Sequence, residues 1–417
     1  MKKLRDACAK KGRYPGARWK RHKFCRTISA GPAYKPSPRP LPSARLRLAA
    51  EVRKKARERF ADARDGLKVP KTRPDFIHDS TGSKLRATII FAPHKLSLAT
   101  NWAEFLGFIY EYQFRTYIEA PEARGRYRPL SIDLSGVKSM SLDAALVLTA
   151  EYHRLCLRLK IKPVIDDASW PGDVRALFDM LGFYRLVNAS DRTGVVGDYT
   201  SPQRFVPFIS DETVDGAMAQ SLIDSLRDVA GRAPANEPTY AALVEAIMNV
   251  INHAYGAVEE PSIIPSVSRW WAAGAYDPRN EMLSFAVYDQ GIGIPATLPR
   301  KTFFEAILTF CPPERNDADL IAGGIEYGRT GTDFPERGNG LWTICQLVEQ
   351  LPGSHVRIWS GRGQIDYQPG GRIKKKLHRN PFCGTLVQWN LKLPSVPKPA
   401  AQPMNEAAPS EIAGDPR

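Results

Sequence analysis

The sequence predicts two folded units in succession, an α/β unit over residues 84–190 and an α+β sandwich over 213–393, preceded by a basic arm. Three observations predict this arrangement. Strand-like and helix-like segments alternate strictly in the first range, whereas helices precede a group of strands in the second. The length of 417 residues fits two or three domains at roughly 150 residues each. For 213–393 we expect helices on one face of a mixed sheet.

The net charge of +15 belongs to the N-terminal arm. Residues 1–74 hold 24 Lys and Arg against 5 Asp and Glu, which leaves 35 basic and 39 acidic residues in the rest of the chain. Residues 1–42 combine Lys and Arg with Pro and Gly, a composition typical of flexible segments. Apolar residues at helical spacing predict a basic amphipathic helix over 43–66, with Ser43 as its N-cap.

Two roles for the basic arm stay open. Its Lys and Arg side chains can neutralise nucleic-acid phosphates, and its interleaved aromatic side chains can stack on bases. A solubilising or membrane-surface tail has the same composition. Nucleic acid is therefore one candidate partner of residues 1–74.

Cysteine usage and hydropathy favour a cytoplasmic protein. The six cysteines lie far apart and form no C-x-x-C pair, which is typical of a reducing compartment. Cys8, His22 and Cys25 could share a metal, but their spacing fits no zinc template and isolated thiols are favoured. We find no signal peptide and no apolar run near the ~20 residues that span a bilayer. The Pro- and Ala-rich segment 394–417 is expected to be a disordered tail.

Six alternating segments justify the α/β prediction. Strands are predicted at 84–92, 128–135 and 160–167, and helices at 101–114, 142–159 and 171–183. Such alternation implies some parallel pairing. We expect residues 191–212 to be a connector and His153 to lie on the surface.

The α+β prediction rests on two helices followed by four strands. The helices are predicted at 212–231 and 238–256, and the strands at 269–277, 282–290, 355–361 and 384–393. Glycine-rich loops separate the strands.

In the second of these helices, Glu245, Asn249 and His253 are spaced by four. They therefore lie within about 80° of one helical face, while apolar residues such as Ile247 offer another face to a sheet. A carboxylate, a carboxamide and an imidazole on one stripe can face a ligand. An amphipathic helix with a polar outer face has the same pattern, so both interpretations stay open.

Two glycine-rich turns follow. An apolar strand ends at Asp289 and continues into Gly291 and Gly293, an arrangement that suits a planar polar group such as a nucleobase amine. Asp before Gly also forms ordinary turns. Further on, Gly338 and Gly340 precede a helix, where backbone N–H groups can cradle a phosphate. This segment is neither a Walker loop nor a dinucleotide fingerprint.

Taken in order, these features and the Gly-Thr pair that opens the last strand resemble the N, G1, G2 and G3 boxes of the gyrase/Hsp90/histidine-kinase/MutL (GHKL) ATPase superfamily. The resemblance covers roughly residues 213–393. It implies a Bergerat-type site for ATP and Mg²⁺. The compact site helix and its place near the C-terminus are closest to the anti-sigma-factor serine kinases.

The resemblance also implies a role for each matching residue. Asn249 would be the Mg²⁺ ligand, Asp289 the acceptor for the adenine amino group and Glu245 the general base. Gly291 and Gly293 would shape the pocket for the base, and Gly338 and Gly340 would form the turn around the phosphates. Thr385 would support Asp289 through a water molecule. Residues 295–337 would form a lid over the triphosphate, from which Arg329 or Arg337 would contact the γ-phosphate. His253 matches a family position too, where a packed imidazole is favoured over a catalytic one.

The upstream unit resembles a STAS (anti-sigma-factor-antagonist) domain over 84–190. The residues that carry this resemblance are RPLSIDLSGVKSMSLDAALVLTAEYHRL and the segment after it. The position that is phosphorylated in that family is occupied here by Leu142, between Ser141 and Asp143. The resemblance therefore implies a docking or sensing domain and no phosphorylation in cis.

Together these features predict an ATP-dependent regulatory enzyme, either an ATPase or a protein serine/threonine kinase of the GHKL type, that switches contacts with a partner protein. Two alternatives stay open. One is a catalytically silent, nucleotide-gated binding module, and the other is a nucleic-acid-associated ATPase that acts through residues 1–74.

Overall fold

The computed structural model describes residues 43–78, 83–119, 130–160, 165–189, 202–214, 216–231, 236–255, 264, 266–330 and 339–394. The contacts divide the chain into two units, Met1–Val52 and Arg53–Arg417. The predicted flexible segment 1–42, with Cys8, His22 and Cys25, lies outside the described residues, as does nearly all of the predicted tail. Helix α2 (Ser43–Arg64) confirms the helix predicted over 43–66. Gly66 follows it with a φ of +75°, the left-handed conformation in which glycine commonly ends a helix.

The upstream part of the second unit is an α/β arrangement around a three-stranded sheet. Its strands are β1 (Thr72–His78), β2 (Lys84–Phe91) and β4 (Leu130–Asp133), and the short strands β3 (Lys95–Leu96) and β5 (Ser139–Met140) form a separate pair. Strand β2 pairs with β4 in parallel, which confirms the parallel pairing expected from the alternation. Strand β1, antiparallel to β2, was not predicted. Of the strand predicted over 160–167, residues 165–167 are not in a strand and 161–164 lie outside the described residues.

The helices of this part confirm the three helical predictions. They are α3 (Trp102–Gln113), continued by the π-helix η2 (Phe114–Glu119), then α4 (Leu142–Leu159), α5 (Gly172–Met180) and the short α6 (Phe183–Leu186).

The downstream part contains a five-stranded sheet in the order β6-β7-β8-β10-β9. Its strands are β6 (Arg204–Asp211), β7 (Trp270–Asp277), β8 (Met282–Asp289), β9 (His355–Gln368) and β10 (Arg372–Lys392). All pairings among these described strands are antiparallel, so the expectation of a mixed sheet is wrong. The connector predicted over 191–212 is wrong too, because β6 lies within it and pairs with β7.

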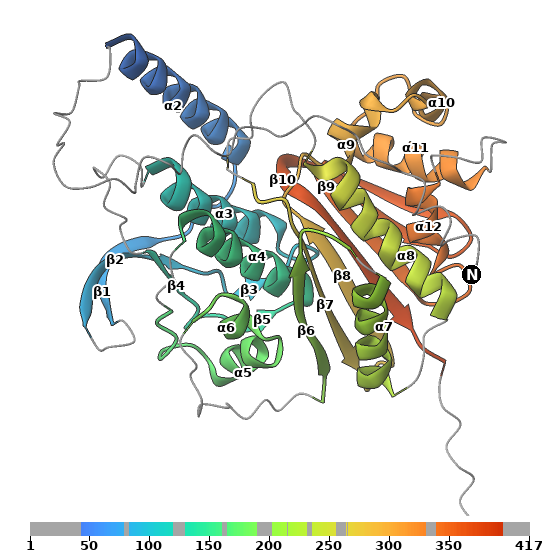
Figure 1. Cartoon of the computed structure of the whole chain (residues 1–417), viewed down its shortest axis with the longest axis horizontal. Helices are drawn as coiled ribbons and strands as arrows, with labels where there is room; N and C mark the ends of the chain where they lie inside the picture. Colours follow the sequence, from blue (N-terminus) through green and yellow to red (C-terminus); the bar gives the residue numbers. More distant parts are fainter. Residues whose placement is uncertain are drawn as a thin grey trace, which may run out of the picture. The chain divides into compact units, whose positions relative to one another are not determined.

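One face of this sheet is covered by helices of the downstream part. These helices are α7 (Gly216–Ala230), α8 (Asn236–Asn249) with its π-helical continuation η4 (Val250–Ala254), α11 (Asp317–Arg329) and α12 (Gly340–Gln346). The segment between β8 and α11 forms α9 (Ile294–Thr297), the 3₁₀ turn η5 (Leu298–Arg300) and α10 (Phe304–Leu308). Figure 1 shows α7 and α8 running along the strands on this side.

The second face of the sheet is covered as well, by the upstream part. Along β7, Trp270 and Ala272 belong to the core under α7 and α8, whereas Trp271 and Ala273 belong to the core that includes α3 and α4. Helix α4 contacts β7 and β8 directly, and Figure 1 shows α3 and α4 on the side of the sheet away from α7 and α8. The expectation of helices on one face is therefore wrong. The physical reason is that the side chains of β7 are apolar on both faces of the sheet, as in strands that are buried on two sides.

A buried polar cluster lies in the interface between α4 and this sheet. Glu151 and Arg154, both on α4, form an ion pair and are almost fully inaccessible to solvent. The second carboxylate oxygen of Glu151 accepts hydrogen bonds from Gln113 Nε2 at 3.0 Å and from Gln290 Nε2 at 3.2 Å. Because an unpaired charge in such a place is costly, these bonds fix how α3 and α4 pack on the end of β8.

His153 lies in the same interface, so the prediction that it is a surface residue is wrong. Only 8% of it is exposed, and its Nδ1 accepts a hydrogen bond from Trp271 Nε1 at 3.1 Å. Burial, with a smaller effect from the charge of Arg269, lowers the pKa of His153 to about 4. The ring is therefore neutral at physiological pH, as an acceptor at Nδ1 requires.

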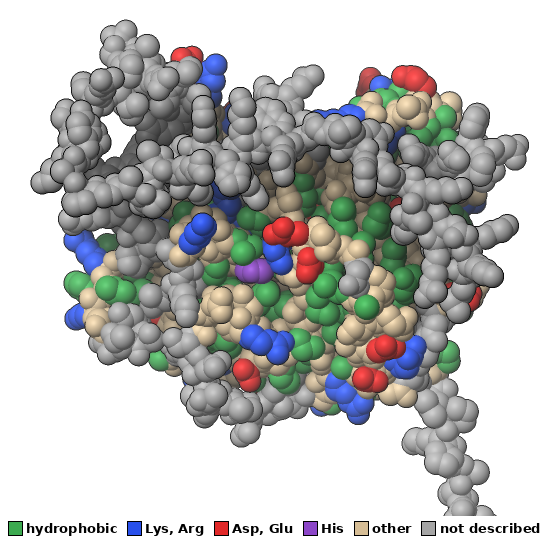
Figure 2. All heavy atoms as spheres, in the orientation of Figure 1, with side chains coloured by type: hydrophobic (Ala, Val, Ile, Leu, Met, Phe, Trp, Pro, Cys, Tyr) green, Lys and Arg blue, Asp and Glu red, His purple; other side chains and the backbone are tan. Residues whose placement is uncertain are grey.

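The exposed side chains of the described residues are mixed in charge. Figure 2 shows acidic and basic side chains interspersed over the described part of the face it draws. In that part of the chain, none of the helices has the length and apolar character needed to cross a bilayer.

The Glu151–Arg154 pair leads to a prediction about stability. Arg154→Met leaves the Glu151 carboxylate buried without its charged partner, and we expect a loss of about 3–5 kcal/mol of unfolding free energy. The double variant Glu151→Gln with Arg154→Met should recover most of that loss, because a glutamine oxygen still accepts from Gln113 and Gln290. Urea unfolding of the three proteins measures both effects. Equal midpoints for wild type and Arg154→Met would contradict the prediction.

Candidate functional site

A cavity of about 810 Å³ lies between α8, the end of β8, the neighbouring stretch of β10 around Thr385, the α9–α10 segment and the start of α12. Its lining brings together seven of the residues singled out in the sequence, namely Glu245, Asn249, His253, Asp289, Gly293, Gly340 and Thr385. Gly291 lies in the loop directly after Asp289. Gly338 and Arg337 lie outside the described residues. Arg329 does not line the cavity, and its guanidinium is bound by Glu326 at 2.5 Å.

The helix that carries the polar stripe changes its winding inside the cavity. Glu245 and Asn249 lie on α8, and the chain continues as a π-helix over Val250–Ala254. At its end the carbonyl of Ala254 accepts a hydrogen bond from Ile292 N at 3.0 Å. A Cβ at Gly291 would lie 2.4 Å from that carbonyl oxygen, so only glycine permits this approach. The helix and the loop after Asp289 are thus joined directly.

Asp289 is the last residue of β8 and a buried wall of the cavity. It is 4% exposed and pairs across the sheet with Thr385 on β10. Its Oδ1 accepts a hydrogen bond from Gly291 N at 2.7 Å. Burial raises the pKa of Asp289 to about 7, although bonds from backbone N–H groups of Gly291 and Thr385 oppose the shift. A buried carboxylate of this kind is suited to accept a hydrogen bond from an amino group of a ligand.

Ser360 is a site residue that the sequence analysis missed. It is fully buried on β9, and its Oγ accepts a hydrogen bond from Ile294 N at 2.8 Å and lies 2.8 Å from Thr385 Oγ1. Gly293, with a φ of +84°, passes so close that a Cβ there would lie 2.8 Å from Ser360 Oγ. Ser360 therefore holds Thr385 and the loop after Asp289 in place. A serine near the end of a predicted strand has no distinguishing sequence signal.

Glu245 lies against the start of α12. A Cβ at Gly340 would be 2.2 Å from Glu245 Oε1, so the carboxylate occupies space that any larger residue at 340 would take. Glu245 is half-buried, and burial raises its pKa, while the charge of Lys301 opposes the shift. A carboxylate with a raised pKa, beside the first backbone turn of a helix, can orient and deprotonate a hydroxyl or a water.

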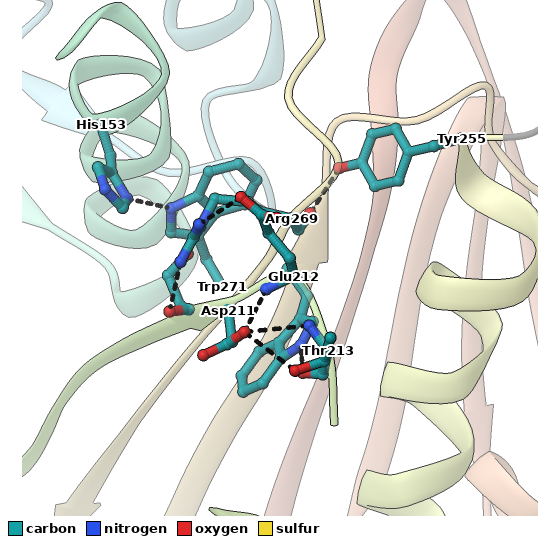
Figure 3. Close-up of polar contacts among 9 residues, drawn as sticks. His153, Asp211, Glu212, Thr213, Tyr255, Arg269 and Trp271 are labelled. Atoms are coloured by element: carbon teal, nitrogen blue, oxygen red, sulfur yellow. Dashed lines mark hydrogen bonds and ion pairs between the residues drawn. The ribbon is translucent and has the colours of Figure 1, made fainter. Parts of the chain in front are cut away.

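Tyr255 also supports the loop after Asp289. Its hydroxyl accepts a hydrogen bond from Gln290 N at 3.0 Å and donates one to the carbonyl of Arg269 at 2.5 Å. The Arg269 guanidinium in turn binds Ser210 and, at 2.9 Å, Glu212, so it fastens the start of β7 to the end of β6 (Figure 3). Neither Tyr255 nor Arg269 belongs to a sequence motif that predicts this role.

The cavity also contains two cations that the sequence analysis missed, Arg300 and Lys301. Lys301 Nζ lies 2.6 Å from His253 Nε2. Arg300 is the last residue of the short turn η5 and Lys301 directly follows it, in a segment without a sequence motif.

A scan against protein-family models finds none that matches this chain, and a search of curated proteins finds no match either.

The buried Asp289 predicts a pH dependence of stability. Because its pKa of about 7 in the folded state exceeds the unfolded value of 3.8, its contribution to stability is complete below pH 3.8 and is lost as the pH rises through 7. The loss is at most about 4 kcal/mol. Asp289→Asn should remove it, so the unfolding free energy of the variant should fall less between pH 5 and pH 8 than that of wild type. Urea unfolding at several pH values measures the slope. Asp228→Asn, on the exposed side of α7, is the control, and equal slopes for all three proteins would refute the prediction.

Proposed function

We propose that this chain is an ATP-binding regulatory protein of the GHKL superfamily, with a Bergerat-type site for Mg·ATP in residues 213–393. The observation that carries the proposal is the single cavity in which Glu245, Asn249 and Asp289 meet. These three residues come from two sequence segments about 40 residues apart, and they are the acidic and amide groups that the resemblance assigns to the nucleotide.

The residues of the cavity fit a purine nucleotide. Its volume of about 810 Å³ lies in the range of pockets for small molecules, roughly 300–1,000 Å³. The buried Asp289 carboxylate is an acceptor for an amino group such as that of adenine. The approach of Gly340 to Glu245 leaves no room for a side chain at the start of α12, where the resemblance puts the phosphate turn.

Each side chain then has a chemical task. When bound, Mg·ATP supplies the phosphoryl group that is transferred to water or to a protein hydroxyl. Asn249 offers a carboxamide oxygen, a ligand that suits a hard divalent cation. Glu245, with its raised pKa, orients and deprotonates the accepting hydroxyl. Hydrolysis and transfer to a partner protein both follow from this arrangement.

We propose further that residues 84–190 form a STAS-like domain with a docking or sensing role in the cytoplasm. Leu142 begins α4 and carries no hydroxyl, and the Ser141 hydroxyl donates to Leu96 O at 3.0 Å. The Asp143 carboxylate is buried and accepts a hydrogen bond from Leu98 N at 2.8 Å. These bonds support a fixed structural role for the start of α4. The four described cysteines are free thiols, which fits a reducing compartment.

Calorimetric titration with Mg·ATP tests the site. We expect wild type to bind, and Asn249→Ala and Asp289→Ala each to lose at least about tenfold in affinity, because each loses a polar contact made in the cavity. Gln220→Ala, on the exposed side of α7, is the matched control and should bind as wild type does. Affinity of wild type should also rise from pH 6 to pH 8, since an amino donor requires the ionised form of Asp289. Absence of binding, or equal binding by all four proteins, would overturn the proposed site.

The role of Glu245 is tested by turnover. Glu245→Ala should keep Mg·ATP binding within a few fold of wild type and reduce phosphate release or transfer by about 100-fold or more. Both are measured with and without candidate partner proteins. If wild type binds Mg·ATP and shows no turnover above this variant, the enzymatic form of the proposal is wrong and the nucleotide-gated binding module replaces it.

A further inference from the structure

Lys301 is a charged residue of the cavity for which no sequence motif predicts a role. It follows the 3₁₀ turn Leu298–Arg300 and lines the same cavity as Asn249 and Glu245. Its Nζ lies 2.6 Å from His253 Nε2, across a separation of 48 residues. The lysine is partly buried, so this contact lies at the cavity wall rather than on an open surface.

The contact defines the state of His253. A lysine ammonium has only hydrogens to donate, so His253 Nε2 must be the unprotonated acceptor and its Nδ1 must carry the hydrogen. Burial lowers the pKa of His253, and the positive charge of Lys301 lowers it further. His253 is therefore a neutral partner that holds the ammonium in position. A carboxylate at position 253 would hold the ammonium equally well but would offset its charge, whereas the neutral imidazole of His253 adds no opposing charge.

The pair also places a positive charge on the polar stripe of α8 and η4. His253 follows Asn249 by four residues, and Asn249 follows Glu245 by four. The charge of Lys301 acts on Glu245, whose pKa it lowers against the larger effect of burial. The ammonium is thus within electrostatic range of the Glu245 carboxylate, and it lines the same cavity as Asn249.

The other basic residues considered for this task are less suitable. Arg329, expected from the sequence to contact the γ-phosphate, is bound by Glu326 and does not line the cavity. Arg337 lies outside the described residues. Arg300 lines the cavity but is exposed. Among the described lining residues, Lys301 is the cation that combines partial burial with a bond to the polar stripe.

We infer that Lys301, positioned by His253, binds the phosphate chain of the nucleotide. The inference rests on the proposed function and adds two residues to its site. A lysine ammonium is a compact charge with three donors and suits phosphate oxygens, to which charged hydrogen bonds are about twice as strong as neutral ones. In this arrangement Lys301 contacts the ligand, and His253 is a positioning residue that acts through it.

The test compares phosphorylated and unphosphorylated forms of one ligand. Lys301→Gln should bind Mg·ATP and ADP about tenfold or more weakly than wild type, whereas its affinity for adenosine should stay unchanged. Lys374→Gln, an exposed cation on β10 outside the cavity, is the control and should bind all three ligands as wild type does. Isothermal calorimetry measures the affinities, and thermal unfolding verifies that each variant is folded.

The positioning role of His253 has its own comparison. His253→Gln keeps an acceptor oxygen for Lys301 and should retain most of the ATP affinity, whereas His253→Leu removes the acceptor and should resemble Lys301→Gln. An equal loss in both His253 variants would show that the imidazole only packs, and would overturn the role given to it.

Two outcomes would overturn the role of Lys301 itself. One is unchanged affinity of Lys301→Gln for Mg·ATP. The other is an equal loss for adenosine and ATP, which would mean that Lys301 supports the pocket without contacting phosphate. Failure of the proposed function is a different result, in which wild type binds none of the three ligands.

Discussion

The rest of the structure depends on the buried carboxylate of Glu151. It forms an ion pair with Arg154 and accepts hydrogen bonds from Gln113 and Gln290, in an interface made mainly of apolar side chains. Charged and polar groups in such surroundings tolerate few alternative arrangements, because each lost partner leaves a desolvated group. The cluster therefore determines how the upstream helices pack on the sheet. Burial of apolar side chains stabilises the contact between these helices and the sheet, and the bonds of Glu151 determine where the helices lie on it.

The same cluster reaches the candidate site through one side chain. Gln290 follows Asp289 directly, and its side chain binds Glu151 while its backbone N–H binds Tyr255. The next residues of the loop are bound to the π-helix through Ala254 and to β9 through Ser360. The loop is thus held by the upstream part, by the helix of the polar stripe and by the sheet. A ligand that displaced Asp289 would have to strain at least one of these bonds.

Local features of the fold could be predicted, and features that depend on both faces of the sheet could not. Helix α4 has the predicted bounds because its apolar spacing and the residues around Ser141 are properties of one segment. The surface prediction for His153 is wrong because periodicity indicates that a helix has a second face but not that a distant sheet covers this face. The run Trp270–Tyr276 is apolar at both its odd and its even positions, a pattern that indicates a strand buried on both faces of the sheet. Strand β6 depends on pairing with the distant strand β7 and has a weak local pattern.

In the candidate site, too, some residues could be predicted from the sequence and others could not, for a chemical reason. Glu245, Asn249 and Asp289 belong to short segments whose residue types and spacing already describe a polar surface, so the sequence could indicate them. Ser360 and Lys301 acquire their roles from contacts with residues 25 to 66 positions away in the chain. A lysine after an arginine in a loop has the same composition as any solvated surface, so a sequence pattern cannot distinguish the two. Charge alone is therefore a poor guide to a ligand contact. The features that distinguish Lys301 are its place in the wall of the cavity and its bond to an imidazole that carries no charge.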